Sequence, residues 1–206
     1  MKHLKPLLML VILCVSLVIA PLNAFAAATS SSSSASSDAT NSAATDDSVQ
    51  RIKQTGTQVV GTSADYPPYE FTTKKNGKTE YVGFEMDVAK QFAKDLGVKL
   101  VIKNMDFDSL LVALESHKVD TVIAGMNITP ERKKSVDFSD PYYAGHKFFL
   151  INKADRNKYK STKDFTGKKV GAQNGAMEYN LVKENIPNVQ EKGLAKIPSL
   201  VLALQS

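Results

Sequence analysis

The chain has 206 residues, of which 26 are lysine or arginine and 21 are aspartate or glutamate, so its formal net charge is +5. The basic residues are scattered among acidic ones and are not clustered with aromatic residues, which excludes the usual footprint of a nucleic-acid-binding protein. The single cysteine, Cys14, lies in an apolar stretch near the start. No intramolecular disulfide can form, and the fold must be held by packing.

The first 26 residues have the pattern of a secretory signal peptide. Two lysines precede an apolar stretch over residues 7–20, and Ala24-Phe25-Ala26 is suited to cleavage. We therefore expect export, to the outer face of the cell membrane or into the medium, with an uncleaved membrane anchor as the alternative. Residues 27–52 begin with a run of small and polar residues that cannot bury enough apolar surface to offset chain entropy, and we predict a disordered linker there.

The next segment is typical of a strand, a stiff turn, a hairpin and a helix. Residues 58–62 favour a strand, and the pair Pro67-Pro68 forbids helix and fixes an extended turn. A hairpin is predicted at residues 75–78, where Asn-Gly stands between two lysines. Residues 85–96 carry apolar side chains at helical spacing and are followed by Gly97, which predicts an amphipathic helix packed on a sheet.

Two further strands flank a helix in the middle of the chain. Residues 100–102 and 121–124 are short apolar runs that favour strands, and the second strand is expected to be buried. Residues 108–116 between them have the apolar spacing of a helix. Alternation of this kind predicts an α/β fold with a mostly parallel sheet.

The pattern after residue 124 indicates a second lobe. Thr129 and Pro130 supply the cap and the first position of another helix. A strand is predicted at residues 148–151, and the alternation restarts with a strand at residues 169–172. The chain is therefore expected to form two α/β lobes.

A nine-residue similarity supports the two lobes. Residues 108–116 (DSLLVALES) and 198–206 (PSLVLALQS) are identical at Ser, Leu, Ala, Leu and Ser. We interpret this as a repeated helix unit; a chance likeness between two helices rich in leucine and alanine is the alternative. The first copy continues into the strand at 121–124, whereas the second ends at Ser206, so the second lobe is expected to lack a core strand and to be incomplete.

Arg132 is the strongest candidate for ligand contact. Ligands of open α/β sheets bind beyond the carboxyl ends of the strands, and Arg132 falls in the first turn of the helix predicted to begin at Thr129. A cation is unfavourable there, so another interaction is expected to hold it. Its guanidinium matches a carboxylate, and the free amide groups of a helix start would add to the attraction for an anion. The alternative is a surface cation balanced by Glu131 or Asp137.

Other residues that follow strands form a coherent set with Arg132, and each also has an ordinary structural alternative. Gly125 would let a ligand approach the backbone, or serve a tight turn. Asn127 can bind an ammonium or a carboxylate, or cap a turn. Tyr66 and Phe107 could close on the two faces of an aliphatic stem, or belong to the core. Residues 173–176 precede a helix whose amide groups could meet the same carboxylate, or form only a strand-to-helix turn.

No catalytic or metal-binding arrangement is predicted. The three histidines are scattered, and neither a Ser/His/Asp set nor metal-ligand spacing stands out. The sequence also has no glycine-rich phosphate loop. We expect no metal, no cofactor and no enzymatic activity.

Several motifs together resemble a known family. They are GTSADYPPYEF at 61–71, GFEMD at 83–87, NMDFD at 104–108, AGMNITPERKK at 124–134 and VDFSDPY at 136–142. From about residue 57 onward the chain resembles the polar amino-acid solute-binding proteins of ABC importers, the glutamine-binding-protein-like members of solute-binding protein family 3. The resemblance implies a two-lobed α/β fold of the periplasmic-binding-protein type II, with lobe 1 at 53–146 and a truncated lobe 2 at 147–206.

The resemblance implies how the backbone end of a free amino acid would be bound. Arg132 would take the α-carboxylate, and the backbone near Ala176 and Met177 would complete the cradle for it. Gly125 through its carbonyl and Asn127 through its side chain would hold the ammonium.

The resemblance also implies how the ligand's side chain would be recognised. Tyr66 and Phe107 would flank it, and Ser63 matches a position that often contacts its tip. Binders of cationic amino acids commonly have an acid at or near the position of Ser63. The resemblance therefore favours glutamine, glutamate or asparagine.

The chain departs from the family pattern in three places. The family usually has Ser or Thr where this chain has Asn127, and often Thr where it has Ala176, which leaves those two contacts open. The acidic residue that normally clamps the ammonium from the second lobe would follow Ser206. The chain as given is therefore expected to bind weakly or not at all.

The implied function is to capture an amino acid outside the cell and deliver it to an ABC permease, which in some family members is fused to the binding domain. A monomer is expected. The alternatives are an enzyme on the same fold, similar to cyclohexadienyl dehydratases or cell-wall lytic enzymes, and a non-transporting sensor or degenerate fragment.

Overall fold

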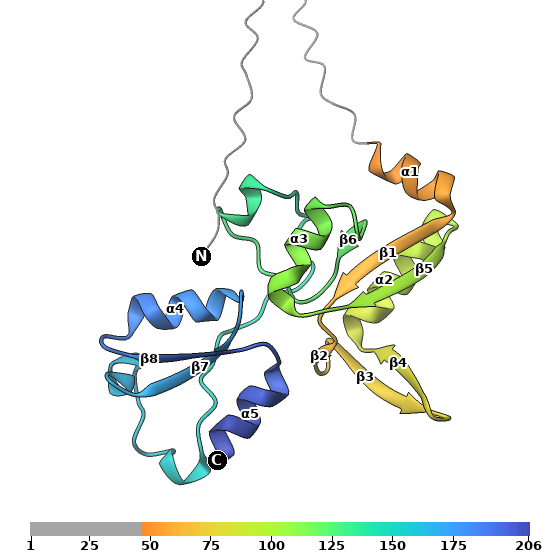
Figure 1. Ribbon diagram of the computed structural model, residues 1–206. Helices are drawn as coiled ribbons and strands as arrows, with labels where there is room; N and C mark the ends of the chain where they lie inside the picture. Colours follow the sequence, from red (N-terminus) through yellow and green to blue (C-terminus); the bar gives the residue numbers. More distant parts are fainter. Residues whose placement is uncertain (1–46) are drawn as a thin grey trace, which may run out of the picture. The chain divides into compact units, whose positions relative to one another are not determined.

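The computed structural model describes residues 47–206 (Figure 1). The predicted signal peptide at 1–26 and most of the linker predicted at 27–52 lie outside the described residues. The predicted end of that linker is wrong, because helix α1 occupies Ser48–Thr55. Ile52 of this helix is 3% exposed. Burial of this side chain against the fold explains why order begins earlier than the polar composition indicates.

A three-stranded parallel sheet forms the first α/β unit. The central strand β1 (Thr57–Thr62) pairs with β5 (Lys99–Asn104) on one side and with β6 (Thr121–Val122) on the other. The strands predicted at 58–62 and 100–102 are confirmed. β6 is shorter and more exposed than the buried strand predicted at 121–124, because it is an edge strand, and of those four residues only Ala124 is buried.

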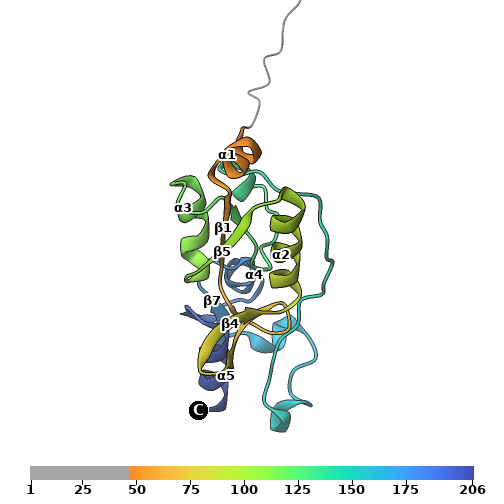
Figure 2. The ribbon, with the colours of Figure 1, turned by 90° about the vertical axis from the view of Figure 1, so that its right-hand side faces the viewer.

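Two helices cover opposite sides of β1 and β5 (Figure 2). α2 (Phe84–Leu96) buries three apolar residues at helical spacing, and it ends where Gly97 adopts a left-handed φ of 71° and donates to the Ala93 carbonyl. α3 (Leu110–Glu115) follows the 3-10 turn η1 (Phe107–Ser109) and buries Leu110 and Ala113. The helices predicted at 85–96 and 108–116 are confirmed, with η1 as the first turn of the second.

An antiparallel sheet connects β1 to α2. It contains β2 (Asp65–Tyr66), β3 (Glu70–Lys75) and β4 (Lys78–Val82). Asn76 and Gly77, with φ of 51° and 75°, form the two-residue turn between β3 and β4, which confirms the predicted hairpin. Gly83, with φ of 119°, then leads into α2. A Cβ there would lie 2.3 Å from the carbonyl oxygen of Tyr69, so only glycine fits.

The second α/β unit contains a two-stranded parallel sheet. β7 (Lys169–Gln173), α4 (Met177–Asn185), β8 (Gln190–Leu194) and α5 (Ile197–Gln205) follow one another along the chain. Two short 3-10 turns, η3 (Lys153–Asp155) and η4 (Thr162–Phe165), precede them. The core consists of Phe165, Val170, Val182 and Ile186. The predicted restart at residues 169–172 is confirmed.

The nine-residue repeat produces matching contacts in the two units. Leu110 and Leu200 hold the same position in the two copies. A Cβ on Gly61 of β1 would lie 3.3 Å from Cδ2 of Leu110, and a Cβ on Gly171 of β7 would lie 2.8 Å from Cδ2 of Leu200. Each unit therefore packs its helix against its first strand through the same leucine–glycine contact, which favours a true repeat over a chance likeness.

The strand predicted at residues 148–151 does not form. Phe148 and Leu150 in this segment are 88% and 68% exposed, and the segment has no regular secondary structure. Its apolar sequence favours a strand, but a strand needs a partner for its backbone hydrogen bonds. None of the described strands pairs with it.

The helix predicted to begin at Thr129 is also wrong. The segment forms a single 3-10 turn, η2 (Arg132–Lys134). One turn fixes several backbone dihedrals for few hydrogen bonds, so a helix must continue to be stable. Ser135 and the β-branched Val136 follow at once, and both are weaker helix formers than the preceding lysines.

Candidate ligand-binding site

A cavity brings together most of the residues predicted to bind ligand. Seven of the eight line it: Ser63, Tyr66, Phe107, Gly125, Asn127, Ala176 and Met177. Arg132 does not line this cavity but lies beside it, because its guanidinium carbon is 5.6 Å from the centre of the Phe107 ring. The structure therefore groups the eight residues around Phe107.

The guanidinium of Arg132 binds two backbone carbonyls. Nη1 donates to the carbonyl of Asn127 at 2.6 Å, and Nη2 donates to that of Gly175 at 2.9 Å. Glu131, one of its predicted alternative counter-ions, pairs with Lys134 at 2.6 Å. Within residues 47–206 no carboxylate forms an ion pair with Arg132. A guanidinium has five N–H donors, so donors remain for a carboxylate.

The turn that carries Arg132 supports only part of the sequence argument. The hydroxyl of Thr129 accepts a hydrogen bond from the backbone N–H of Arg132 at 3.2 Å, as expected for a cap. Because η2 has three residues, no helix dipole acts there. Any attraction for a carboxylate must come from the guanidinium. Burial lowers the pKa of Arg132, and the charge of Glu178 acts in the opposite direction.

Phe107 joins the two α/β units. Its side chain is 8% exposed and forms an apolar cluster with Leu110 and Ala124, against which Ala176 packs. Ala176 precedes α4, which begins at Met177. The sequence pointed to amide groups near Ala176 and Met177, whereas the group of this segment that bonds to Arg132 is the carbonyl of Gly175.

A buried carboxylate holds the loop that contains Gly125. The backbone N–H of Gly125, which has a φ of 57°, donates to Oε2 of Glu85 at 2.7 Å. The hydroxyl of Tyr142 donates to Oε1 of the same carboxylate at 2.8 Å. Glu85 is 3% exposed. One side chain therefore fixes both Gly125 and the segment that leads out of the first unit.

Glu70 lies next to Glu85 in the same buried environment. It is 1% exposed, and burial together with the neighbouring charge of Glu85 raises the pKa of Glu70 to about 9. A raised pKa favours the protonated form of Glu70 at neutral pH, and Oε2 of Glu70 has no hydrogen-bond partner among the described residues. Neither glutamate was predicted to be a site residue, because isolated glutamates are usually exposed. The one indication in the sequence is their position, since Glu70 begins the hairpin and Glu85 follows Gly83 by two residues.

Asn127 already contacts an ammonium group. Its Oδ1 accepts a hydrogen bond from Nζ of Lys147 at 3.0 Å, and Lys147 also pairs with Glu178. The oxygen that the resemblance assigns to a ligand's ammonium is therefore occupied by a lysine side chain. Neither Lys147 nor Glu178 was identified from the sequence, because they lie 31 residues apart and have no recognisable spacing.

Tyr66 presents an aromatic surface to the cavity. It is 42% exposed and stacks on Tyr69, with ring centroids 5.0 Å apart. The hydroxyl of Tyr69 is 2.7 Å from that of Tyr143. A Cβ on Gly125 would lie 3.8 Å from the Tyr66 ring. Tyr66 and Gly125 are thus neighbours, as a shared ligand contact requires.

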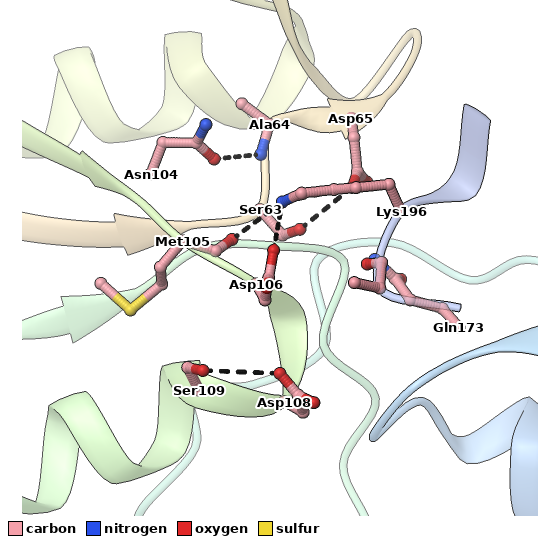
Figure 3. Close-up of polar contacts among 11 residues, drawn as sticks. Ser63, Ala64, Asp65, Asn104, Met105, Asp106, Asp108, Ser109, Gln173 and Lys196 are labelled. Carbon is pink, nitrogen blue, oxygen red and sulfur yellow. Dashed lines mark hydrogen bonds and ion pairs between the residues drawn. The ribbon is translucent and has the colours of Figure 1, made fainter. Parts of the chain in front are cut away.

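Ser63 belongs to a charged cluster that crosses between the two units (Figure 3). Ser63 is 1% exposed, and its hydroxyl donates to Oδ2 of Asp65 at 3.4 Å. Nζ of Lys196 lies 3.7 Å from the same oxygen and 2.9 Å from Oδ1 of Asp106. Neither acid nor Lys196 was predicted to be a site residue. The repeat offered a signal, since Asp106 and Lys196 each stand two residues before one copy.

No metal site accompanies these groups within residues 47–206, where no cluster of three or more His, Cys, Asp and Glu side chains could hold an ion. The arrangement offers a guanidinium, carboxylates and aromatic rings around one cavity. Such groups can bind a small zwitterion.

Comparison with known proteins gives a consistent result. Residues 59–197 match the family described as bacterial extracellular solute-binding proteins, family 3. The chain is similar to the arginine-binding extracellular protein ArtP of Bacillus subtilis, with 44% identity over 129 residues, which are 63% of this chain and 48% of ArtP. The chain therefore spans about half the length of this curated relative.

The chain also resembles solved structures of amino-acid-binding proteins, two of which illustrate the likeness. One is the amino acid ABC transporter substrate-binding protein AbpA of Streptococcus pneumoniae bound to L-arginine, with 36% identity and a TM-score of 0.74, covering 76% of this chain and 66% of AbpA. The other is the ancestral amino acid-binding protein AncCDT-1, described as a precursor of cyclohexadienyl dehydratase, with 38% identity and a TM-score of 0.72 over 76% of this chain and 69% of that protein. Both names describe amino-acid-binding proteins.

Proposed function

Because the chain belongs to family 3 of the bacterial extracellular solute-binding proteins, we propose that it captures a free amino acid outside the cell for an ABC importer. The predicted two-lobed α/β fold of the periplasmic-binding-protein type II is confirmed by the likeness to AbpA and AncCDT-1. We assign residues 53–146 to lobe 1 and residues 147–206 to the part of lobe 2 that is present here.

The environment of Arg132 carries this proposal. Its guanidinium is partly buried beside Phe107 and is bonded only to neutral carbonyls among the residues described. A buried cation without an acidic partner is costly, and an incoming carboxylate would supply the missing charge. Arg132 therefore binds the α-carboxylate of the ligand.

The ammonium of the ligand binds to acceptors near Asn127 and Gly125, which precede Arg132 in the chain. Asn127 Oδ1 and Glu178 already accept an ammonium, that of Lys147. The carbonyl of Gly125, which Glu85 holds in place through the Gly125 N–H, supplies a further acceptor. Ligand binding would then displace Lys147 from Asn127.

L-Arginine is the favoured ligand. The expectation of glutamine, glutamate or asparagine lacks support, since ArtP is named for arginine and AbpA was solved with L-arginine bound. That expectation depended on Ser63, which is not an acid. The structure places Asp65 in contact with Ser63, and both line the cavity. A carboxylate therefore stands at the position where the resemblance places the side-chain tip.

An ABC permease is the proposed partner, and the outer face of the membrane is the proposed location. Among residues 47–206 no helix is long and apolar enough to cross a membrane. A signal sequence at residues 1–26 stays a prediction. The role is binding and delivery by a monomer, without a chemical reaction.

The test is isothermal titration calorimetry with a panel of free amino acids, followed by Arg132→Ala. The substitution is expected to weaken L-arginine binding about 100-fold, because charge-assisted hydrogen bonds to the carboxylate are lost. Agmatine, which has the arginine side chain but no carboxylate, should bind equally weakly to both proteins.

Lys133→Ala is the matched control, since Lys133 is the exposed neighbour of Arg132 and carries the same charge. It should bind L-arginine as the unmodified chain does. Equal affinity of Arg132→Ala and the unmodified chain for L-arginine would refute the carboxylate assignment. Because weak binding is expected of the chain as given, the panel is titrated at ligand concentrations on the order of 10 mM. A folded chain that binds no amino acid under these conditions would refute the proposed function.

A further inference from the structure

Lys196 is the centre of a charged cluster that the ligand contacts do not include. Its Nζ lies 2.9 Å from Oδ1 of Asp106 and 3.7 Å from Oδ2 of Asp65, and it donates to the carbonyl of Met105 at 3.4 Å (Figure 3). Three groups of the first α/β unit therefore converge on one lysine from the second. The ammonium is shared between two carboxylates and leaves one negative charge in excess.

The two carboxylates differ in their relation to the cavity. Asp65 lines it, together with Ser63, whereas Asp106 and Lys196 do not. The side chain of Asp65 is 9% exposed and that of Asp106 is 51% exposed. Asp65 is thus the acid whose charge reaches the cavity, and Lys196 offsets that charge without lining the cavity itself.

The surroundings of Asp65 make this charge sensitive to Lys196. Burial raises the pKa of Asp65, while the Lys196 ammonium and the Ser63 hydroxyl act against that rise. Solvent screens a largely buried carboxylate poorly, so the loss or gain of one nearby charge changes the potential at the cavity substantially.

We propose that Lys196 is a specificity-determining residue, which sets how strongly the site prefers a cationic ligand side chain over a neutral one by neutralising Asp65. The proposal depends on the proposed function, because it concerns the ligand of the same site. Lys196 acts through Asp65 and does not touch the ligand. Its position before the second repeat copy, matching that of Asp106 before the first, places the two partners opposite each other.

The test compares L-arginine with L-citrulline, which has the same length and a neutral urea group in place of the guanidinium. The measured quantity is the ratio of the Kd for L-citrulline to the Kd for L-arginine, obtained by calorimetry on the full chain. Effects of a substitution on the docking of the two units alter both Kd values alike and cancel in the ratio. The ratio therefore reports charge selectivity alone.

Lys196→Gln should raise this ratio about tenfold, because Asp65 then acts on the ligand with its full charge. Lys196→Arg, which keeps the charge, should leave the ratio unchanged. Lys192→Gln is the matched control, since Lys192 is exposed on the preceding strand β8. It should also leave the ratio unchanged, because Lys192 pairs with neither carboxylate of the cluster and solvent screens an exposed charge.

Asp106→Asn should change the Kd ratio in the opposite direction to Lys196→Gln. It can replace that variant if Lys196→Gln does not fold. It frees Lys196 to pair with Asp65 alone, so the ratio should fall at least threefold. An unchanged ratio in Asp106→Asn, or in a folded Lys196→Gln, overturns the inference while arginine binding itself stands. If the unmodified chain binds neither ligand, the proposed function is refuted and this inference with it.

Discussion

The two α/β units place a leucine against a strand glycine in the same way, and they bury that leucine to different extents. Leu110 of the first unit is fully buried, whereas α5, which carries Leu200, has no buried residue. Gly61 also meets Val119, which is 2% exposed and leads into the third strand, β6. The leucine–glycine contact therefore directs the helix onto the sheet, and the strand after the helix completes the burial.

A second difference between the units concerns buried polar groups. The region of the first unit buries Glu70 and Glu85 behind Gly125, whereas Gln173 is the buried polar residue described in the second. Buried polar groups cost stability unless they are hydrogen-bonded, and Glu85 bonds to the Gly125 N–H and the Tyr142 hydroxyl. The difference indicates that the first unit determines most of the geometry of the site.

The largest expected effect is the difference in stability lost when Leu110 and Leu200 are each replaced by alanine. Leu110→Ala should lower the free energy of unfolding by about 3 kcal/mol, because it leaves a cavity in a closed core. Leu200→Ala should cost only about 1 kcal/mol, since its surroundings are partly open. Urea denaturation followed by circular dichroism measures both. Val112→Ala, at a 62% exposed position of α3, is the control and should change little. Equal costs at the two leucines would contradict the role given to β6.

The next largest effect is a difference in stability between amide substitutions of the two buried acids, Glu85 and Glu70. Glu85→Gln should cost about 2 kcal/mol, because an amide cannot accept hydrogen bonds from both the Gly125 N–H and the Tyr142 hydroxyl with the strength of a carboxylate. Glu70→Gln should not lower the stability at neutral pH and should raise it, because glutamine resembles the protonated acid in shape and donors and has no proton to release on unfolding. Thermal unfolding of the two variants decides this. A larger loss in Glu70→Gln than in Glu85→Gln would reverse the assignment of the proton.

The smallest effect is a pH dependence that belongs to the first unit. The pKa of Glu70 is raised to about 9 in the folded chain, from 4.5 in the absence of its surroundings. Between these values the folded chain keeps a proton that the unfolded chain releases, so stability falls as pH rises and becomes level above pH 9. The loss between pH 7 and pH 8 should be about 1 kcal/mol.

Urea denaturation at several pH values, compared between the unmodified chain and Glu70→Gln, isolates this contribution. The variant has no proton to lose at residue 70, so its stability should decline less over the same range. Parallel curves for the two proteins would show that Glu70 is ionised in the folded state.

The sequence predicted elements whose stability depends on nearby residues. The hairpin at Asn76-Gly77 and the end of α2 at Gly97 depend on local backbone preferences, and both are confirmed. The strand predicted at 148–151 is wrong, because a strand depends on a partner elsewhere in the chain. The helix expected at Thr129 is wrong because a good cap does not compensate for a segment that cannot continue the helix.

The candidate site likewise contains parts that local motifs predict and parts that depend on contacts between distant residues. Motifs identified the loops that carry Arg132, Gly125 and Tyr66, and the structure brings these loops together. The pairing of Lys196 with Asp65 could not be predicted from the sequence, because it depends on how the two units dock. Electrostatic partners contributed by separate units are the part of such a site that needs a three-dimensional structure.

The two carbonyls that bind Arg132 set a threshold for any anion that approaches it. Because the guanidinium already donates to Asn127 and Gly175, a competing anion must offer better acceptors than neutral backbone oxygens. A carboxylate does so, since charge-assisted hydrogen bonds are about twice as strong as neutral ones and a planar carboxylate matches the guanidinium fork. Chloride has no such geometry and gains less from the exchange. The pairing thus protects the arginine from the common salts that surround an exported protein.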